Sequence, residues 1–193
     1  MKPKNLTKKF VTVGVILSLF LHPDTIFSNA RPDAVLGVGK FSSSPEGVAM
    51  PDGWEPLTFK KISRHTRYTL VMDAGRVVVK ANSEASSSGL IRKIRIDPKE
   101  YPLIEWRWKV LNIYQKGDVT SKAGDDYPAR LYITFESNPA DMGLFEKVKY
   151  EDYKSAFGRK PPMISGVAIM TDSDNTGEST TAFYGDIIFK KNQ

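Results

Sequence analysis

Short stretches of alternating apolar and polar residues run along the chain from Trp54 onward, separated by turn signals such as Asp73-Ala74-Gly75. A period of two is typical of strands that bury one face, because successive side chains point to opposite sides of a sheet. The pattern predicts eight strands, at Leu57–Ile62, Tyr68–Met72, Val77–Ala81, Leu90–Ile96, Ile104–Val110, Ala129–Phe135, Ile164–Thr171 and Phe183–Phe189.

One further segment has helical rather than strand spacing. Apolar residues between Tyr150 and Phe157 fall three and four positions apart, and Gly158 followed by Pro161-Pro162 would end a helix there. Eight strands and one short helix favour an all-β fold, a two-sheet β-sandwich of jelly-roll type. Residues 31–53 mix Pro, Gly and Ser, which predicts a lead-in segment or linker before a β-sandwich domain at residues 54–193.

Strand alternation predicts which side chains face solvent. In residues 104–110, Trp106 and Trp108 are in phase with the apolar ends of the strand, so both are expected in the core with Arg107 on the opposite face. The same alternation separates polar from apolar side chains in residues 129–135 and 183–189. Because charged groups are costly to bury without partners, the polar faces are expected to meet water or a ligand. The candidate ligand-binding residues are Arg107, Arg130, Tyr132, Tyr184 and Asp186.

The first thirty residues have the features of a secretion signal. Lysines at positions 2, 4, 8 and 9 precede an apolar stretch at residues 10–21, and Ser28-Asn29-Ala30 fits a cleavage site. The apolar stretch is shorter than the roughly 20 residues that cross a bilayer. Residues 1–30 are therefore expected to be a signal peptide, the protein to be secreted to the periplasm, and no membrane span to remain after cleavage.

Composition narrows the classes of function. The 193 residues include no cysteine, which excludes disulfides, thiolate zinc sites and a cysteine nucleophile. Residues 1–30 hold four lysines and one aspartate, so without them the net charge falls from +6 to +3. No basic stripe of the kind that binds nucleic acid is present, and no nucleic-acid partner is expected.

Two acidic motifs, GDDYPAR at residues 124–130 and TDSDNTG at residues 171–177, are the strongest candidates for a site. Asp172, Asp174 and Thr176 alternate as in the first half of an EF-hand loop, but Phe183 stands where that loop ends in a bidentate Glu. A structural calcium would need further ligands, for which Asp125 or Asp126 are the choices. The alternatives are a loop of turn-forming residues and a catalytic carboxylate pair.

Several stretches together resemble a family of secreted bacterial proteins known as DUF3047. They are Trp54, ANSEASSSGL (81–90), YPLIEWRWKV (101–110), GDDYPARLYITF (124–135), EDYKSAFG (151–158), ISGVAIMTDSDNTG (164–177) and AFYGDIIF (182–189). The resemblance implies no activity, since none is attached to the family. Relative to the family pattern, the segment between Phe135 and Lys147 is short, which predicts a missing hairpin and a changed sheet edge.

These features favour a protein that binds a carbohydrate or a related polar ligand without catalysis. Two alternatives stay open. One is a polysaccharide-cleaving enzyme that uses Asp125 or Asp126 with Arg130 and Tyr184, and the other is a structural envelope protein. His65 has no nucleophile elbow to accompany it and is interpreted as a surface residue. Apart from a structural calcium ion, the sequence indicates no cofactor. It does not indicate an oligomeric state.

Overall fold

The structure, a computed structural model, describes residues 34–136, 158 and 161–192. The predicted signal peptide, the predicted helix at Tyr150–Phe157 and most of the shortened segment after Phe135 lie outside the described residues. The elements are β1 (Val35–Gly39), the 3-10 helix η1 (Phe41–Ser43), β2 (Glu55–Leu57), β3 (Arg67–Asp73), β4 (Arg76–Glu84), β5 (Ser87–Ile96), β6 (Leu103–Val110), β7 (Arg130–Phe135), β8 (Ile164–Asp172) and β9 (Ser179–Lys190).

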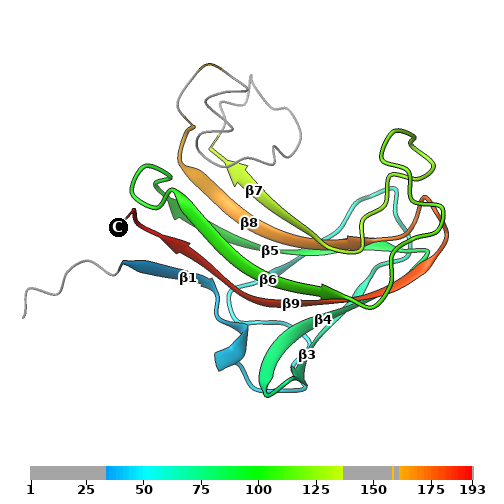
Figure 1. Ribbon diagram of the computed structural model, residues 1–193, viewed down its shortest axis with the longest axis horizontal. Helices are drawn as coiled ribbons and strands as arrows, with labels where there is room; N and C mark the ends of the chain where they lie inside the picture. Colours follow the sequence, from blue (N-terminus) through cyan, green and yellow to red (C-terminus); the bar gives the residue numbers. More distant parts are fainter. Residues whose placement is uncertain (1–33, 137–157, 159–160, 193) are drawn as a thin grey trace, which may run out of the picture. The chain divides into compact units, whose positions relative to one another are not determined.

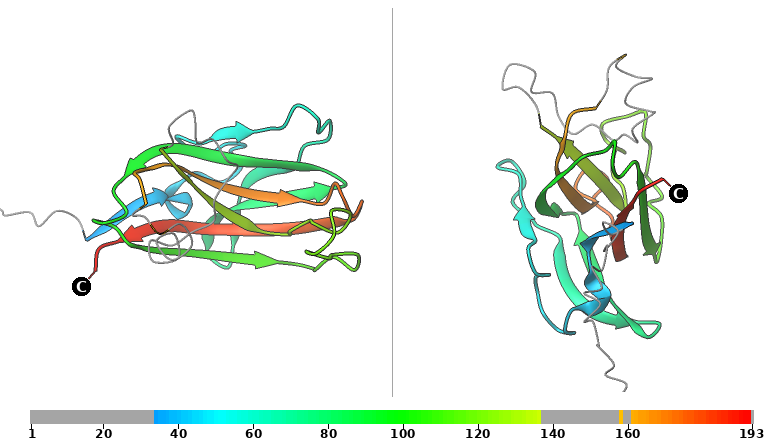
Figure 2. Two further views of the ribbon diagram at one scale, coloured as in Figure 1. Left: turned by 90° about the horizontal axis from the view of Figure 1, so that it is seen from above. Right: turned by 90° about the vertical axis from the view of Figure 1, so that its left-hand side faces the viewer.

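The described strands form two antiparallel sheets, so the all-β class predicted from the sequence is confirmed (Figures 1 and 2). Sheet A consists of β1, β3, β4, β6 and β9, and sheet B has the order β2-β5-β8-β7. Within sheet A, β9 pairs with β4 through its first half and with β1 through its second half, while β6 pairs along its other edge. The long strand β9 therefore holds sheet A together.

Apolar side chains of both sheets share one core. Sheet A contributes Leu70, Val79 and Ile187, among others, and sheet B contributes Leu90, Val167 and Ile169. The core also contains Val38 and Phe41, which are 0% and 1% exposed. The prediction of a linker over residues 31–53 is therefore wrong for residues 35–43. A register shift between Gly37 and Gly39 interrupts the alternation of β1, which is why this strand gave no period of two.

A bulge in β9 changes which of its side chains face the core. Trp106 is opposite Ile187 but Trp108 is opposite Tyr184, so Gly185 and Asp186 together face one residue of β6. Alternation is shifted by one position at the bulge, and Tyr184 lies on the same face as Ile187, at 0% exposure. The prediction that Tyr184 shares a polar face with Asp186 is wrong for this reason.

Trp106 and Trp108 do not share the burial that the sequence predicted. Trp106 packs against the core and its ring stacks on Tyr184, with 6.2 Å between centroids. Trp108 stacks on Trp106 at 6.0 Å but is 56% exposed. In the described part of the chain β6 pairs only with β9 and is therefore an edge strand. The position at the edge leaves the Trp108 ring largely in solvent.

Two shorter predictions also need correction. The strand predicted at Leu57–Ile62 ends at Leu57, and Ile62 N donates to Phe59 O (3.0 Å) to close a turn away from the sheet. No strand was predicted over residues 82–89, but β4 reaches Glu84 and β5 begins at Ser87, and the serines at 83 and 86–88 are all at most 3% exposed. Ser83 Oγ bonds Ser86 Oγ (2.9 Å) and Ser173 Oγ (2.8 Å), so these hydroxyls form a buried network where the chain passes from β4 to β5.

The two tryptophans give a test of the bulge. Trp106→Ala should lower the free energy of unfolding by about 3 kcal/mol, because it removes a ring packed on Tyr184 and leaves a cavity. Trp108→Ala should cost less than about 1 kcal/mol, because that ring is mostly in water. Urea denaturation followed by circular dichroism measures both. Equal losses in the two variants would contradict the assignment of inside and outside on β6.

Candidate functional site

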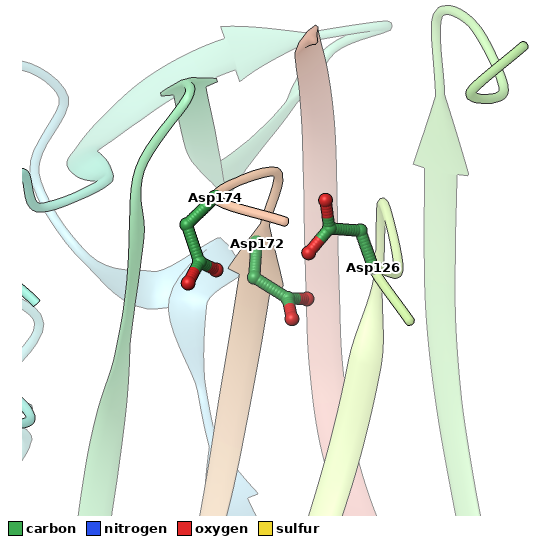
Figure 3. Close-up of side chains that lie close together, drawn as sticks. All are labelled: Asp126, Asp172 and Asp174. Atoms are coloured by element: carbon green, nitrogen blue, oxygen red, sulfur yellow. The ribbon is translucent and has the colours of Figure 1, made fainter. Parts of the chain in front are cut away.

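Three carboxylates meet at one end of sheet B. Asp172 ends β8, Asp174 lies on the loop that follows, and Asp126 lies on the segment before β7 (Figure 3). Each offers an oxygen within 4.8 Å of the other two. The structure thus brings together the two acidic motifs that the sequence singled out, although 42 positions separate Arg130 of the first from Asp172 of the second.

Asp126 is committed to holding the loop of the second motif. Its Oδ1 accepts from Asn175 N (3.3 Å) and Asn175 Nδ2 (3.2 Å). Its Oδ2 accepts from Thr176 N (2.6 Å) and Thr176 Oγ1 (2.7 Å), and the Asp126 side chain is buried. Gly177 then turns the chain with φ of +71°, a conformation that glycine adopts without steric cost. The loop is therefore fixed by a residue from the other motif.

Asp172 is buried at 3% exposure and pairs with the guanidinium of Arg130. Its Oδ1 also accepts from Tyr127 N at 3.1 Å. Burial raises the pKa of Asp172 to about 7, although Arg130 and the Tyr127 N–H lower it, and the charges of Asp126 and Asp174 raise it further. Asp172 is thus a carboxyl group that titrates near neutral pH.

Arg130 lies between two aromatic rings. Its guanidinium carbon is 4.3 Å from the centroid of Tyr127 and 5.5 Å from that of Tyr132. The Nε of Arg130 is buried and has no hydrogen-bond partner in the described part of the structure. A buried donor without an acceptor is costly, so Arg130 Nε stands out among the polar atoms of the site.

Three tyrosine hydroxyls fix the end of β8 from behind. Tyr184 donates to Met170 O (2.6 Å), Tyr114 donates to Asp172 O (2.6 Å), and Tyr68 accepts from Thr171 N (3.2 Å). Burial raises the pKa of all three tyrosines, so their hydroxyls stay protonated. Sequence analysis missed Tyr68 and Tyr114 because their roles depend on contacts between distant strands.

An open pocket of about 540 Å³ lies beside these groups, and we call it the Arg130 pocket. Its lining includes the turn after β2, with Phe59, Lys60 and Lys61, and also Asp125, Arg130 and Asp174. The carboxylates of Asp125 and Asp174 accept no hydrogen bond from any residue in the described ranges, which leaves them available to a ligand. Met170 and Phe59 add apolar surface.

The structure separates the remaining predicted site residues. Tyr132 contacts Arg130 across the face of sheet B. Thr176 serves the loop through its bond to Asp126. Arg107 and Asp186 line a different hollow on sheet A. Tyr184 is buried between the sheets and is not accessible to a ligand, which corrects its prediction as a ligand-binding residue.

A family profile described as protein of unknown function (DUF3047) matches residues 52–151 and 150–188. The chain belongs to this family. Both acidic motifs of the Arg130 pocket lie within the matched residues. No curated protein and no solved structure matches the chain. No helix among residues 34–136 and 161–192 is long and apolar enough to cross a membrane. Membership of DUF3047 supplies no activity.

A calcium ion at this site would compete with Arg130. Calcium takes roughly six to eight oxygen ligands. Both oxygens of Asp126 already accept hydrogen bonds, and the guanidinium of Arg130 lies against Asp172, where a cation would bind. Asp125 and Asp174 are the carboxylates still available. Arg130 therefore supplies the positive charge that the acidic cluster needs.

The titration of Asp172 should appear in the stability of the protein. The unfolded carboxyl loses its proton near pH 3.8, whereas the native one holds it up to about pH 7. Between these values the native state binds more protons, so the free energy of unfolding should fall as pH rises from about 4 to about 7. Urea denaturation across this range should show a flatter slope in Asp172→Asn. An unchanged slope in Asp172→Asn, with Asp52→Asn as an exposed control, would contradict the raised pKa.

Calcium dependence tests the role of Arg130. The melting temperature of the wild-type protein should be the same in calcium and in chelator. Arg130→Gln removes the competing charge, so this variant should melt higher in calcium, by up to about 2.7 kcal/mol of stability at 100 times the dissociation constant. Differential scanning calorimetry measures both. A calcium-induced rise in the wild-type protein that Asp174→Asn abolishes would show instead that the ion binds beside Arg130.

Proposed function

We propose that this protein binds a carbohydrate or a related polar ligand in the Arg130 pocket, without catalysis. The observation that carries the proposal is the state of the polar groups that line the pocket. Arg130 Nε is a buried donor without a partner, while the carboxylates of Asp125 and Asp174 accept no hydrogen bond within the described residues. A ligand rich in hydroxyl groups satisfies both kinds of group, because a hydroxyl donates and accepts.

The shape and lining of the pocket also suit a sugar. Ligand sites combine apolar surface with a few placed polar groups, and the Arg130 pocket sets Phe59 and Met170 beside its charged groups. The apolar face of a pyranose packs on such side chains while its hydroxyls reach Arg130 and Asp174. Lys60 and Lys61, also in the lining, add donors. The pocket thus offers contacts to a neutral, polar ligand rather than to a single ion.

The setting of this binding function is part of the proposal. We propose that the two sheets form a β-sandwich of jelly-roll type, a fold whose faces and loops often carry ligand sites. The signal-like residues 1–30 support secretion to the periplasm.

A glycan array followed by calorimetry tests the proposal. The folded protein should bind one class of envelope glycan, and Asp174→Asn and Arg130→Lys should each weaken that binding at least tenfold, which is about 1.4 kcal/mol. Lysine keeps the charge of Arg130 but lacks the Nε donor and the planar fork. Glu100→Gln, an exposed carboxylate outside the pocket, is the matched control. Binding to no glycan, or equal binding by all variants, would count against the proposal.

A polysaccharide-cleaving enzyme is the second candidate, and the pKa of Asp172 favours it. A carboxyl group that titrates at about pH 7 is suited to general acid catalysis, and Asp174 is a second carboxylate nearby. Tyr184 has no part in such a mechanism because it is buried. Release of shorter products from the bound glycan, lost in Asp172→Asn, would establish this activity in place of simple binding.

A further inference from the structure

A second hollow lies on the outer face of sheet A, away from the core, and we call it the sheet A groove. It has a volume of about 480 Å³. The turn between β3 and β4 borders it on one side and β6 on the other, with Ser42 of η1 also in its lining. The groove shares no lining residue with the Arg130 pocket.

Each carboxylate that lines the groove is already bound by a group of the protein. Asp73 accepts from Lys109 Nζ at 2.6 and 2.7 Å, and Glu105 pairs with Lys190. Asp186 accepts from Ser42 N (2.8 Å) and Ser42 Oγ (2.5 Å). These three carboxylates are therefore not available to attract a cation.

Two arginines of the groove are not engaged in this way. Arg76 begins β4 and Arg107 lies within β6, and both are exposed. Neither forms a salt bridge or a side-chain hydrogen bond with another residue in the described ranges. The two arginines lie on different strands, Arg76 three residues before the first β4 residue that pairs with β9 and Arg107 on β6, which pairs with the other edge of β9. The free charge of the groove is thus positive and divided between two positions.

The groove also has apolar lining. Val78 of β4 and Ile188 of β9 belong to it, and Gly185 adds no side chain. A Cβ on Gly185 would come within 3.1 Å of Arg107 Cβ, so glycine keeps the bulge low beneath Arg107. Lys109 Nζ, 4.3 Å from the centroid of the Phe183 ring, closes one wall. Apolar lining together with two unpaired arginines suits a ring that has an apolar face and carries carboxylates.

We propose that the sheet A groove binds an acidic oligosaccharide through carboxylates on its sugar units. Arg76 and Arg107 each receive one carboxylate in the bidentate geometry that guanidinium favours. The apolar faces of the sugar rings lie on Val78 and Ile188. Because the two cations are on different strands, the ligand has to carry at least two carboxylates to engage both. This site does not depend on the function proposed for the Arg130 pocket.

Calorimetry with the full chain and tetragalacturonate tests the proposal, and fully methyl-esterified tetragalacturonate is the neutral control. Tetragalacturonate should bind and the ester should not, and binding should weaken as salt is raised because the arginines are exposed. Arg76→Gln and Arg107→Gln should each weaken binding at least tenfold. Arg67→Gln, an exposed arginine on β3 outside the groove, and Asp174→Asn in the Arg130 pocket should leave binding unchanged.

Three outcomes would overturn the proposal. Equal binding of the acid and its ester would show that the carboxylates are not recognised. Binding that survives Arg76→Gln and Arg107→Gln but fails in Asp174→Asn would assign the ligand to the Arg130 pocket. Binding of inorganic phosphate as tight as that of tetragalacturonate would show a general anion site rather than an oligosaccharide site. Circular dichroism of each variant confirms that a loss of binding is not a loss of fold.

Discussion

The bulge of β9 is the constraint on which the arrangement of both sheets depends. One extra residue at Gly185-Asp186 shifts the alternation of the strand, so that Tyr184 and Ile187 both face the core. Without the shift, either the tyrosine or the isoleucine would point outward. The same bulge carries Asp186 to the outer face, where Ser42 binds it and ties η1 to the sheet. A single irregularity thus decides which side chains form the core and which line the sheet A groove.

The burial of a charged group is the main constraint at the end of β8, where Asp172 lies. Removing a carboxylate from water is costly unless it is paired, and Asp172 is almost fully buried among two further aspartates. Arg130 and the Tyr127 N–H offset part of that cost. The offset is incomplete, because burial still raises the pKa of Asp172. Shifted pKa values of this kind are common at functional sites, since a structure selected only for stability has no need of them.

The sequence predicted the elements of the fold better than their side-chain faces. Seven of the eight predicted strands lie within or close to β3 to β9, because long runs of alternating residues are a strong signal. The strand β1 was missed because glycines and a bulge interrupt it. Tyr184 and Trp108 were assigned to the wrong environments because no local pattern shows a bulge in β9 or the position of β6 at an edge.

The acidic site shows the same division between what is local and what is not. Asp125, Asp126, Asp172 and Asp174 stood out in the sequence because oxygen donors are dense in two short motifs. The different roles of these residues were not predictable from the sequence. Asp126 accepts hydrogen bonds from the loop at Thr176, whereas Asp174 lines the pocket. The pairing of Asp172 with Arg130 depends on β7 lying beside β8. Residue types alone suggested a metal, and the strand order adds an arginine beside the same carboxylates.

Tyr184 links the two candidate sites, although it belongs to neither surface. Its backbone is next to the bulge that shapes the sheet A groove, and its hydroxyl donates to Met170 O two residues before Asp172. The hydroxyl also bonds Thr171 Oγ1 at 2.7 Å, so sheet A holds the end of β8 through Tyr184 as well as through Tyr68. A change in the bulge would therefore move this hydroxyl and with it the carboxylate that Arg130 pairs. The geometry of the Arg130 pocket and that of the sheet A groove both depend on the bulge that keeps Tyr184 in place.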